Sequence, residues 1–248
     1  DERALALMVR DVEVAQALVA CRPEELEILT SPRRPIVLLR RRTDATTSAV
    51  CAAVAPGNPL LGVMLPYTPL HHLLMCELGT LPVVMTSGNR SDEPMAYRDD
   101  DARVRLGDLA DLVLCHNRPI EIRCDDSVTR WLPGSTLPGG ESPVRRARGY
   151  APAPLRLPLA CDEPILAVGG QLKNVFALGR DTSAFLSHHL GDLDHWEAAE
   201  AFRREIPLLE QLLLATPPTR IVHDAHPDYV STHYAVERAE RGGLRRLA

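Results

Sequence analysis

The sequence predicts two domains of the mixed α/β (α+β) class, joined by a proline-rich segment. With 248 residues, 45% of them hydrophobic, the chain is long enough for two separate cores. In its first part, short apolar runs alternate with segments of helical periodicity. Four prolines then fall within residues 152–164, and the spacing of apolar runs and turn residues is different after them. We therefore expect a first domain over 1–152, a stiff linker over 153–164 and a second domain over 165–248.

Composition argues against several classes of protein. No run approaches ~18 consecutive apolar residues, so we expect no membrane span, and the start at Asp1 shows no signal-peptide pattern. The six cysteines form no Cys-x-x-Cys pair, which argues against a disulfide framework or zinc ribbon and for the reducing cytoplasm. A net charge of −5 gives no overall attraction to nucleic acid or to an anionic membrane. Every basic residue is arginine except Lys173, whose compact ammonium a guanidinium cannot replace everywhere.

The first domain begins with a strand over 4–9, and Asp11 is placed to cap a helix running to about Ala20. Pro23 opens a second helix, and a strand over 35–40 follows. The further elements expected in this domain are strands over 60–64, 81–85 and 111–115, a helix between Thr68 and Gly79, and a helix beginning at Asp99.

A polar loop over 86–94 follows the apolar strand 81–85, a position where ligands bind in open α/β sheets. Thr86, Ser87 and Asn89 offer short hydrogen-bonding groups, and Gly88 permits a close backbone approach. Such a loop can hold a phosphate or a nucleotide. Taken alone, a polar turn after a strand is more often purely structural.

The segment 116–130 concentrates charged and polar side chains. Asp125 and Asp126 beside Ser127 are of the kind that holds Mg²⁺ on a nucleotide or orients a hydroxyl. Arg123 and Arg130 have the planar fork that binds phosphate with two hydrogen bonds. The alternative is a salt-bridged turn. A second basic cluster, with Arg145, Arg146 and Arg148, has no acid beside it and suits a polyanionic ligand.

The second domain is expected to open with three hairpin-connected strands, over 165–168, 174–178 and 182–187. A long amphipathic helix from about His195 to Leu213, a strand over 220–223 and a helix from about Asp228 complete the pattern. This is the element order of a ribonuclease-H/actin-like nucleotide-binding lobe. In such a lobe the first turn faces the phosphates, and here that turn holds Gly169, Gly170 and Lys173. A metal site at His223 and His226 is the less favoured interpretation, because Pro227 breaks helical ligand spacing.

Eight motifs, in order along the chain, resemble one family. They are LPYTPLH (65–71), TSGNRSDEP (86–94), HNR (116–118), RCDDSV (123–128), RRARGYAP (145–152), GGQLKN (169–174), SHHLGDL (187–193) and DAHPDYVST (224–232). The first five resemble the YrdC-like domain of the HypF family of hydrogenase-maturation carbamoyltransferases, which has a twisted mixed sheet. The last three resemble the start of that family's actin-like transferase domain. Three positions depart from the family's usual residues: Gly88, Gln171 and His188.

The resemblance implies a fragment of a longer protein, one that begins inside the YrdC-like domain. The family's acylphosphatase-like and zinc-finger-like modules, and its His-rich metal motif, are expected elsewhere. Zn²⁺ or Fe is accordingly expected only in segments outside this chain.

The resemblance also implies a reaction. The YrdC-like domain would form carbamoyl-adenylate from ATP and carbamoyl phosphate. The actin-like domain would pass the carbamoyl group to the C-terminal cysteine of HypE, with neither nucleic acid nor membrane as a partner. The residues implied around nucleotide and carbamoyl phosphate are Thr86, Ser87, Asn89, Arg123, Asp125, Asp126, Ser127, Arg145, Arg148, Gly169 and Gly170. Asp125 or Asp126 would face Mg²⁺, and Lys173, His189 and Asp192 would be catalytic in the transfer domain.

Three alternatives are less well supported. A threonylcarbamoyl-adenylate synthase shares the YrdC-like fold, but the lobe after Pro164 argues against it. A small-molecule O-carbamoyltransferase has both domains in the reverse order. A non-catalytic RNA-binding module would need a basic face with exposed aromatic residues, which a net charge of −5 and 4% aromatic residues do not suggest.

Overall fold

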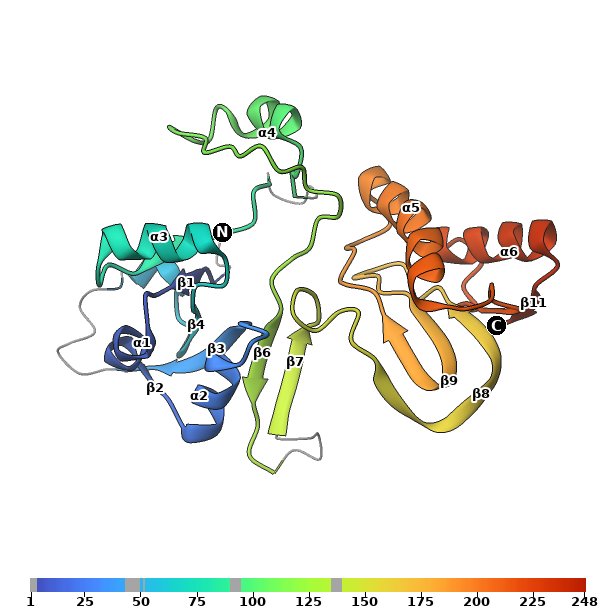
Figure 1. The fold of residues 1–248 in the computed structure, drawn as a ribbon, viewed down its shortest axis with the longest axis horizontal. Coiled ribbons are helices and arrows are strands. Elements are labelled where there is room, and N and C mark those ends of the chain that lie inside the picture. The colour runs from blue at the N-terminus through green and yellow to red at the C-terminus, as the bar shows by residue number, and fades with distance from the viewer. Residues whose placement is uncertain (1–3, 43–49, 51, 90–94, 135–139) are drawn as a thin grey trace. The chain divides into compact units, whose positions relative to one another are not determined.

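The structure is a computed structural model that describes residues 4–42, 50, 52–89, 95–134 and 140–248 (Figure 1). It divides into two compact units. The first unit comprises residues 1–87 and 126–149, and the second comprises residues 88–125 and 150–248. Residues 88–125 therefore group with the C-terminal part, although the sequence suggested that they belong to the first domain. Residues 90–94 of the predicted polar loop lie outside the described residues.

The first unit is built on a seven-stranded mixed sheet with the order β5-β1-β4-β3-β6-β7, and the short β2 pairs with β3. The strands are β1 (Ala6–Met8), β2 (Val19–Ala20), β3 (Ile36–Arg41), β4 (Leu60–Met64), β5 (Val83–Met85), β6 (Val128–Trp131) and β7 (Glu141–Arg145). β1 is parallel to β4 and β3 is parallel to β6, whereas the other neighbouring pairs are antiparallel. The expected mixed α/β class is confirmed for this unit.

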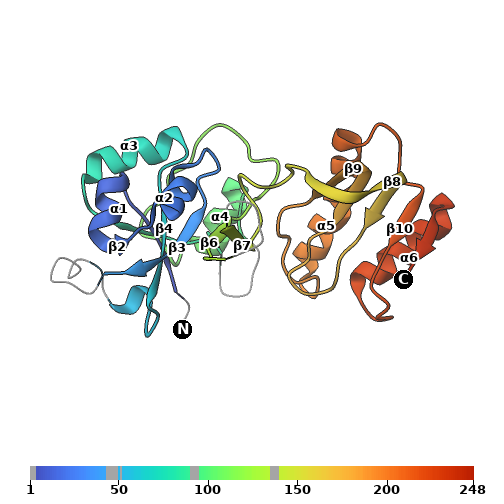
Figure 2. The ribbon, with the colours of Figure 1, turned by 90° about the horizontal axis from the view of Figure 1, so that it is seen from below.

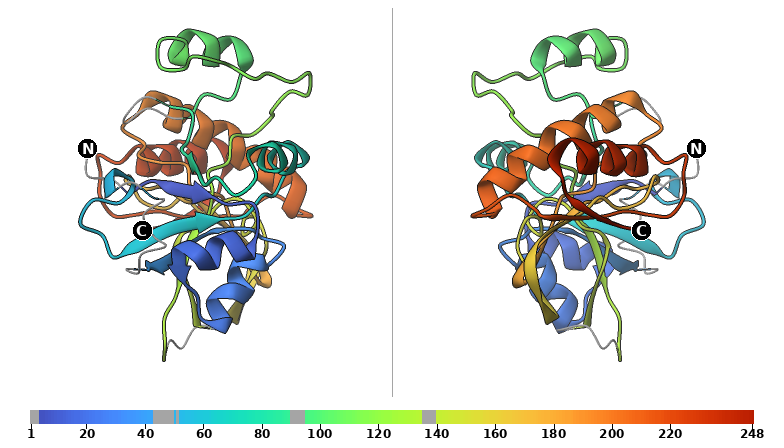
Figure 3. Two further views of the ribbon diagram at one scale, coloured as in Figure 1. Left: turned by 90° about the vertical axis from the view of Figure 1, so that its left-hand side faces the viewer. Right: turned by 90° about the vertical axis from the view of Figure 1, so that its right-hand side faces the viewer.

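Alternating side chains place a core on each face of this sheet. Leu7, Val37 and Val63 pack in one cluster with residues of α1 (Val12–Leu18) and α2 (Pro23–Thr30). Their neighbours Met8, Ile36 and Met64 pack in a second cluster with Met75 of α3 (Pro69–Leu78). Helices α1 and α2 therefore cover one face of the sheet and α3 the other (Figure 3).

The helix starts follow local capping signals. Oδ1 of Asp11 accepts a hydrogen bond from the Val14 N–H at 3.0 Å, and Oγ1 of Thr68 accepts one from the His71 N–H at 3.2 Å. Each bond satisfies one amide that a first helical turn leaves open. Gly79, at φ 64°, ends α3 as expected.

The second unit contains a four-stranded sheet in the order β11-β10-β8-β9. Its strands are β8 (Leu155–Ala167), β9 (Ala177–Leu186), β10 (Arg220–Val222) and β11 (Arg245–Leu247), and its helices are α4 (Asp99–Leu106), α5 (Trp196–Leu213) and α6 (Val230–Gly242). β8 and β9 run side by side as one long curved ribbon (Figures 1 and 2). The core lies between this sheet and helices α5 and α6, where the Phe202 ring meets the rings of Phe176 and Tyr234 edge to face.

Three expected features of the second unit differ in the structure. The linker predicted over 153–164 is largely strand, because residues from Leu155 onward pair with β9. Pro158 and Pro164 lie where the pairing register between β8 and β9 shifts. Strand pairing is interrupted there, so the missing N–H of each proline removes no hydrogen bond between the strands. The predicted turn at 179–181 lies inside β9, which continues through Asp181 although that residue adopts φ 51°. The three predicted hairpin strands are therefore two long ones.

The strand predicted over 111–115 does not form. This apolar run has no regular secondary structure and is largely exposed, with Leu112 90% and Leu114 77% exposed, and it pairs with no strand of the described chain. An apolar run predicts a strand only where a neighbouring strand is available to pair with it. Within the described residues, no helix combines the length and the hydrophobicity that crossing a membrane requires.

Candidate functional site

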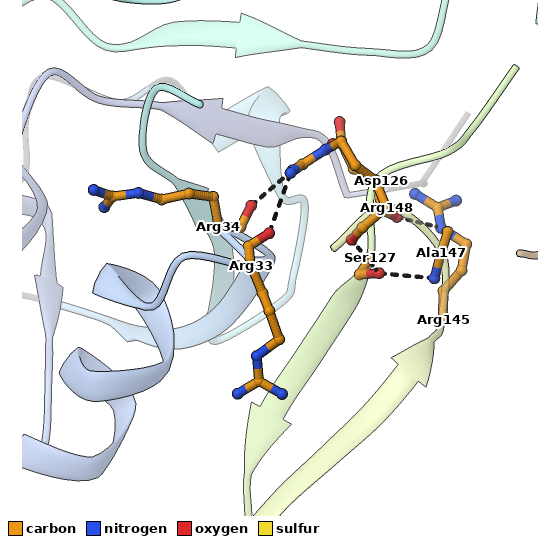
Figure 4. A network of polar contacts seen from close by, with 7 residues as sticks. All are labelled: Arg33, Arg34, Asp126, Ser127, Arg145, Ala147 and Arg148. Atoms are coloured by element: carbon orange, nitrogen blue, oxygen red, sulfur yellow. Dashed lines mark hydrogen bonds and ion pairs between the residues drawn. The ribbon is translucent and has the colours of Figure 1, made fainter. Parts of the chain in front are cut away.

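Several of the predicted site residues meet at one end of the first unit's sheet (Figure 4). β3 and β6 are parallel with Ile36 opposite Val128, so the residues before each strand lie side by side. β7 returns antiparallel and places Arg145 opposite Val128. We call the resulting group the Arg148 cluster, and it comprises Arg33, Arg34, Asp126, Ser127, Arg145 and Arg148.

Arg148 holds this cluster together. Its Nε donates to Oδ1 of Asp126 at 2.7 Å, and its terminal nitrogens donate to the carbonyls of Arg33 and Arg34 at 3.1 and 2.7 Å. Its guanidinium carbon also lies 3.3 Å from the ring centroid of Tyr67. The guanidinium thus joins the segment before β6, the segment before β3 and the loop after β4, which makes Arg148 a positioning residue.

Ser127 is also engaged with the backbone. Its hydroxyl donates to the Arg148 carbonyl at 2.9 Å and accepts from the Ala147 N–H at 2.7 Å, and the residue is 1% exposed. These contacts fasten β6 to the segment after β7. They give no support to the prediction that Ser127 touches a phosphate.

Arg145 is the member of the cluster best placed to meet a ligand. Its Nε donates to the Asp126 carbonyl at 2.8 Å, which fixes the base of the guanidinium. Its terminal nitrogens make no hydrogen bond within the part of the chain that the structure describes, and they point away from the strands (Figure 4). A guanidinium held at one nitrogen with its fork open is suited to a phosphate or a carboxylate.

Two further side chains border the cluster, although the sequence suggested only packing or surface roles for one of them. The His71 ring meets the Tyr67 ring edge to face at 4.5 Å. Burial raises the pKa of Tyr67 to about 12. Burial also lowers the pKa of His71, so this imidazole is neutral near pH 7 and can donate or accept one proton.

Thr86 and Ser87 lie at the other end of the sheet. β5 runs antiparallel to β1 with Met85 opposite Ala6, so the exposed Thr86 and Ser87 follow the end of β5 that lies beside the start of β1. The Arg148 cluster lies at the opposite strand ends, beyond Ile36 and Val128. The sheet therefore separates these two groups of predicted residues along the strand direction.

In the second unit, the turn after β8 carries the predicted Gly169, Gly170 and Lys173. The Asn174 amide, 1% exposed, donates from Nδ2 to the carbonyls of Val168 and Gly170 at 3.0 and 2.6 Å. Gly169 adopts φ 69° close to the backbone of Val175, where a side chain would collide with the Val175 carbonyl. The turn is therefore held from within by Asn174, which lies in a motif that the sequence singled out but was not predicted as a site residue.

A second loop, residues 187–193, packs against this turn and brings Asp192 to it. Oδ1 of Asp192 accepts a hydrogen bond from the Lys173 N–H at 2.6 Å. The Asn174 N–H donates to the Gly191 carbonyl at 2.8 Å. Three of the predicted residues, Gly170, Lys173 and Asp192, thus belong to one connected structure. Lys173 sits at φ 49° with its side chain exposed, so the ammonium is accessible.

Gln171 links the same turn to α5 and α6. Its Nε2 donates to Oδ1 of Asp194 at 2.7 Å just before α5, and its Oε1 accepts from the Val230 N–H at 2.9 Å at the start of α6. Both functional groups of the amide are used, which an acidic side chain at this position could not reproduce.

Arg123 lies beside the loop 187–193. Its Nη2 approaches the Leu190 carbonyl at 3.4 Å, which places it next to the predicted His189. Asp125 interacts electrostatically with both Arg123 and His188. Arg123 and Asp125 therefore belong to the second unit, whereas the Arg148 cluster, with which the sequence grouped them, belongs to the first. Asn89 is also in the second unit, in a loop closed by the hydrogen bond from the Ala96 N–H to the Gly88 carbonyl.

A cavity of about 300 Å³ opens beside Arg123. Four arginines (Arg98, Arg105, Arg123 and Arg204) and three carboxylates (Asp101, Glu197 and Glu200) line it, together with Tyr97 and the exposed Trp196. Positive and negative side chains nearly balance in this lining, and Arg105 already pairs with Asp101 at 3.0 Å, so the cavity shows no preference for an anionic ligand.

The carboxylates do not form a ready Mg²⁺ site. The described residues contain no group of three or more His, Cys, Asp or Glu side chains able to hold a metal ion. Asp126 already pairs with Arg148 through one carboxylate oxygen, and Asp125 lies in the other unit. Mg²⁺ usually combines one or two carboxylates with substrate phosphates and water. A contact of Asp125 or Asp126 with Mg²⁺ therefore stays a prediction.

Two family models match the chain. The Sua5/YciO/YrdC model, described as "Telomere recombination", matches residues 1–137. The model of the HypF Kae1-like domain matches residues 160–245.

Curated relatives and solved structures agree with these matches. The chain is 43% identical over 215 residues to carbamoyltransferase HypF of Synechocystis sp., covering 87% of this chain and 27% of the relative. It is 39% identical to carbamoyltransferase HypF2 of Cupriavidus necator, covering 100% of this chain and 32% of the relative. A crystal structure of full-length HypF in the phosphate- and nucleotide-bound form matches with a TM-score of 0.86 and 41% identity, over 99% of this chain and 37% of that one. The chain thus spans about a third of the length of these relatives.

Proposed function

Since the chain belongs to the Sua5/YciO/YrdC family and is of the HypF carbamoyltransferase type, we propose that it takes part in ATP-dependent carbamoyl transfer. In this proposal, water cleaves carbamoyl phosphate to carbamate and phosphate, and the carbamate attacks the α-phosphate of ATP to give carbamoyl-adenylate and pyrophosphate. The C-terminal cysteine thiolate of a HypE-type partner then takes the carbamoyl group and AMP leaves, on the way to the cyanide ligands of [NiFe] hydrogenase. The observation that carries the proposal is the match over 99% of the chain to a HypF structure with bound phosphate and nucleotide.

In the first unit, the Arg148 cluster is proposed to bind the phosphate-bearing substrates. Arg145 would contact a phosphate through its terminal nitrogens, and Arg148 would keep Asp126 and the two neighbouring carbonyls in place. Fixed cations help adenylate formation because they stabilise negative charge that develops on the phosphoryl oxygens. A Mg²⁺ ion arriving with ATP would neutralise part of the same charge. Thr86, Ser87 and Asn89 remain proposed substrate contacts on the loop after β5.

In the second unit, the turn 169–174 and the loop 187–193 are proposed to form the transfer site. Backbone groups at Gly169 and Gly170 would approach phosphate, and the exposed Lys173 ammonium would supply its positive charge. Asp192 would position Lys173 through the hydrogen bond to its N–H. His189 would accept the proton of the incoming thiol, which must be ionised to attack the carbamoyl carbon.

Nucleotide binding tests the assignment of Arg145. We expect Arg145→Ala to weaken ATP binding by about tenfold, measured by titration calorimetry on the 248-residue chain, because a charge-assisted phosphate contact contributes about 1.4 kcal/mol. Arg40→Ala is the matched control, since Arg40 is exposed on β3 of the same unit and is not among the predicted ligand contacts. Equal losses in the two variants would show a general charge effect and remove Arg145 from the site.

Adenylate formation tests the loop after β5. We expect Ser87→Ala combined with Asn89→Ala to reduce carbamoyl-phosphate-dependent ATP–pyrophosphate exchange by at least about 100-fold, because removing preorganised donors to a reacting phosphate costs several kcal/mol. The assay should be run on this chain and, with equivalent substitutions, on the full-length Synechocystis relative. Exchange at the unsubstituted rate in the relative would exclude the loop from the reaction.

A further inference from the structure

Two buried ionisable side chains face each other beneath the loop 187–193. His188 is 7% exposed and Glu205, on α5, is 1% exposed. Nε2 of His188 lies 3.4 Å from Oε2 of Glu205, just beyond hydrogen-bond length. Neither of these two atoms has a hydrogen-bond partner among the described residues. A single proton placed between them would satisfy both atoms, as donor on one side and acceptor on the other.

The surroundings limit how much charge the pair can carry. Arg204 donates from Nη2 to the other Glu205 oxygen at 3.3 Å and from Nη1 to the Tyr97 hydroxyl at 3.1 Å. Arg123, Asp125 and His189 are the other charged or titratable groups that act on the pair. The local balance is already positive, so an additional imidazolium charge in this buried place is unfavourable.

The pKa values of both groups follow from this environment. Burial raises the pKa of Glu205 to about 7, although Arg204 and Arg123 oppose the shift. Burial, reinforced by Arg123, lowers the pKa of His188 to about 4. Between these values the pair carries one proton, on the carboxyl group, and the imidazole is neutral.

We propose that His188 and Glu205 share one proton as a buried couple, and that this couple positions the loop 187–193 against α5. The loop also carries His189 and Asp192, so both residues act from a backbone that the couple holds. The adjacent Ser187 hydroxyl anchors the same stretch on its other side, accepting from the Phe176 N–H at 3.1 Å and donating to the His188 carbonyl at 2.9 Å. Only the role of the loop in transfer rests on the proposed function, since the couple itself needs no substrate.

The pH dependence of stability tests the couple. In His188→Gln, Glu205 remains with a raised pKa, so its folded state binds the proton more tightly than the unfolded state. The stability that Glu205 contributes is then fully present below about pH 4.5 and is lost as the pH rises through about 7. In Glu205→Gln, His188 remains with a lowered pKa, so stability is present above about pH 6.5 and is lost as the pH falls toward 4.

The two single variants are therefore expected to have melting temperatures that change with pH in opposite directions, by on the order of 5 °C between pH 4.5 and 7.5. The melting temperature of each single variant is compared, at every pH, with that of the double variant His188→Gln/Glu205→Gln. The double variant lacks both groups and so gives the pH dependence that all other titrating groups cause. The melting temperature of the unsubstituted protein should change with pH as that of the double variant does between about pH 4.5 and 6.5. In this range His188 and Glu205 together hold one proton in the folded state and one in the unfolded state, so the pair adds no pH dependence. Single variants that both run parallel to the double variant would overturn the proposal.

Histidine titration by NMR gives an independent readout. The His188 Cε1–H signal is expected to stay at its neutral position from pH 5 to 8, and the His189 signal should shift in Glu205→Gln, because its loop loses the anchor. The exposed Glu240→Gln variant is the control and should leave the His189 signal in place. A His188 signal that titrates near pH 6.5, or a His189 signal unchanged by Glu205→Gln, would contradict the couple. Neither measurement requires ATP or carbamoyl phosphate, so failure here is separable from failure of the proposed reaction.

Discussion

Replacing Arg148 with alanine is expected to lower the free energy of unfolding of the first unit by about 3–5 kcal/mol. The substitution removes three hydrogen bonds, to Asp126 and to the carbonyls of Arg33 and Arg34, and the contact with the Tyr67 ring. It leaves a carboxylate with 26% side-chain exposure without its cation. Breaking a partly buried ion pair costs far more than breaking an exposed one, because the remaining charge stays desolvated.

Urea unfolding followed by tryptophan fluorescence measures this effect. Trp131 lies in β6 and reports on the first unit, and a Trp196→Phe background removes the signal of the other tryptophan, which is 68% exposed. Arg148→Lys keeps the charge but cannot make the three bonds, so it should recover less than half of the loss. Arg130→Ala should cost less than about 0.5 kcal/mol. Equal unfolding midpoints for Arg148→Ala and Arg130→Ala would show that the cluster does not hold the sheet edge.

Replacing Asn174 with alanine is expected to destabilise the second unit by about 2–3 kcal/mol and to open the turn 169–174. The Asn174 side chain is the donor for two carbonyls, at Val168 and Gly170, in a place with almost no access to water. Each carbonyl left buried without a donor costs about 1–3 kcal/mol, and a hydrogen bond from water to that carbonyl reduces this cost. Because Gly169, Gly170 and Lys173 share this turn, phosphate binding should weaken together with stability.

Hydrogen exchange followed by mass spectrometry localises this second effect. Peptides over 169–174 and 187–193 should exchange faster in Asn174→Ala, because the backbone bonds between Asn174 and Leu190–Gly191 join the two segments. Asn117→Ala is the matched control, since that asparagine is exposed in the same unit. Exchange that rises uniformly over the whole unit would indicate general destabilisation and would count against a turn held by Asn174.

The predictions that depend on local signals agree with the structure. The caps at Asp11 and Thr68, the stop at Gly79 and the helix from His195 to Leu213 need only neighbouring residues, and all are present. The linker over 153–164 and the strand over 111–115 were wrong because strand formation depends on a distant partner. β8 gains β9 in spite of its prolines, whereas residues 111–115 have no neighbouring strand among the described residues.

The sequence by itself determined the mixed α/β class, the order of the motifs and their family, because hydrophobic periodicity, capping and motif spacing are all read along the chain. Only the tertiary structure decided what the individual polar side chains do. It made Arg148 and Ser127 internal ties, left the Arg145 guanidinium open, and separated Thr86 and Ser87 from that cluster along the sheet. It also brought His188 against Glu205, a contact between a loop and a helix that lie apart in the sequence. The reason is physical: a hydrogen bond is decided by which atoms the strand register and helix packing bring within about 3 Å, and no local pattern records that choice.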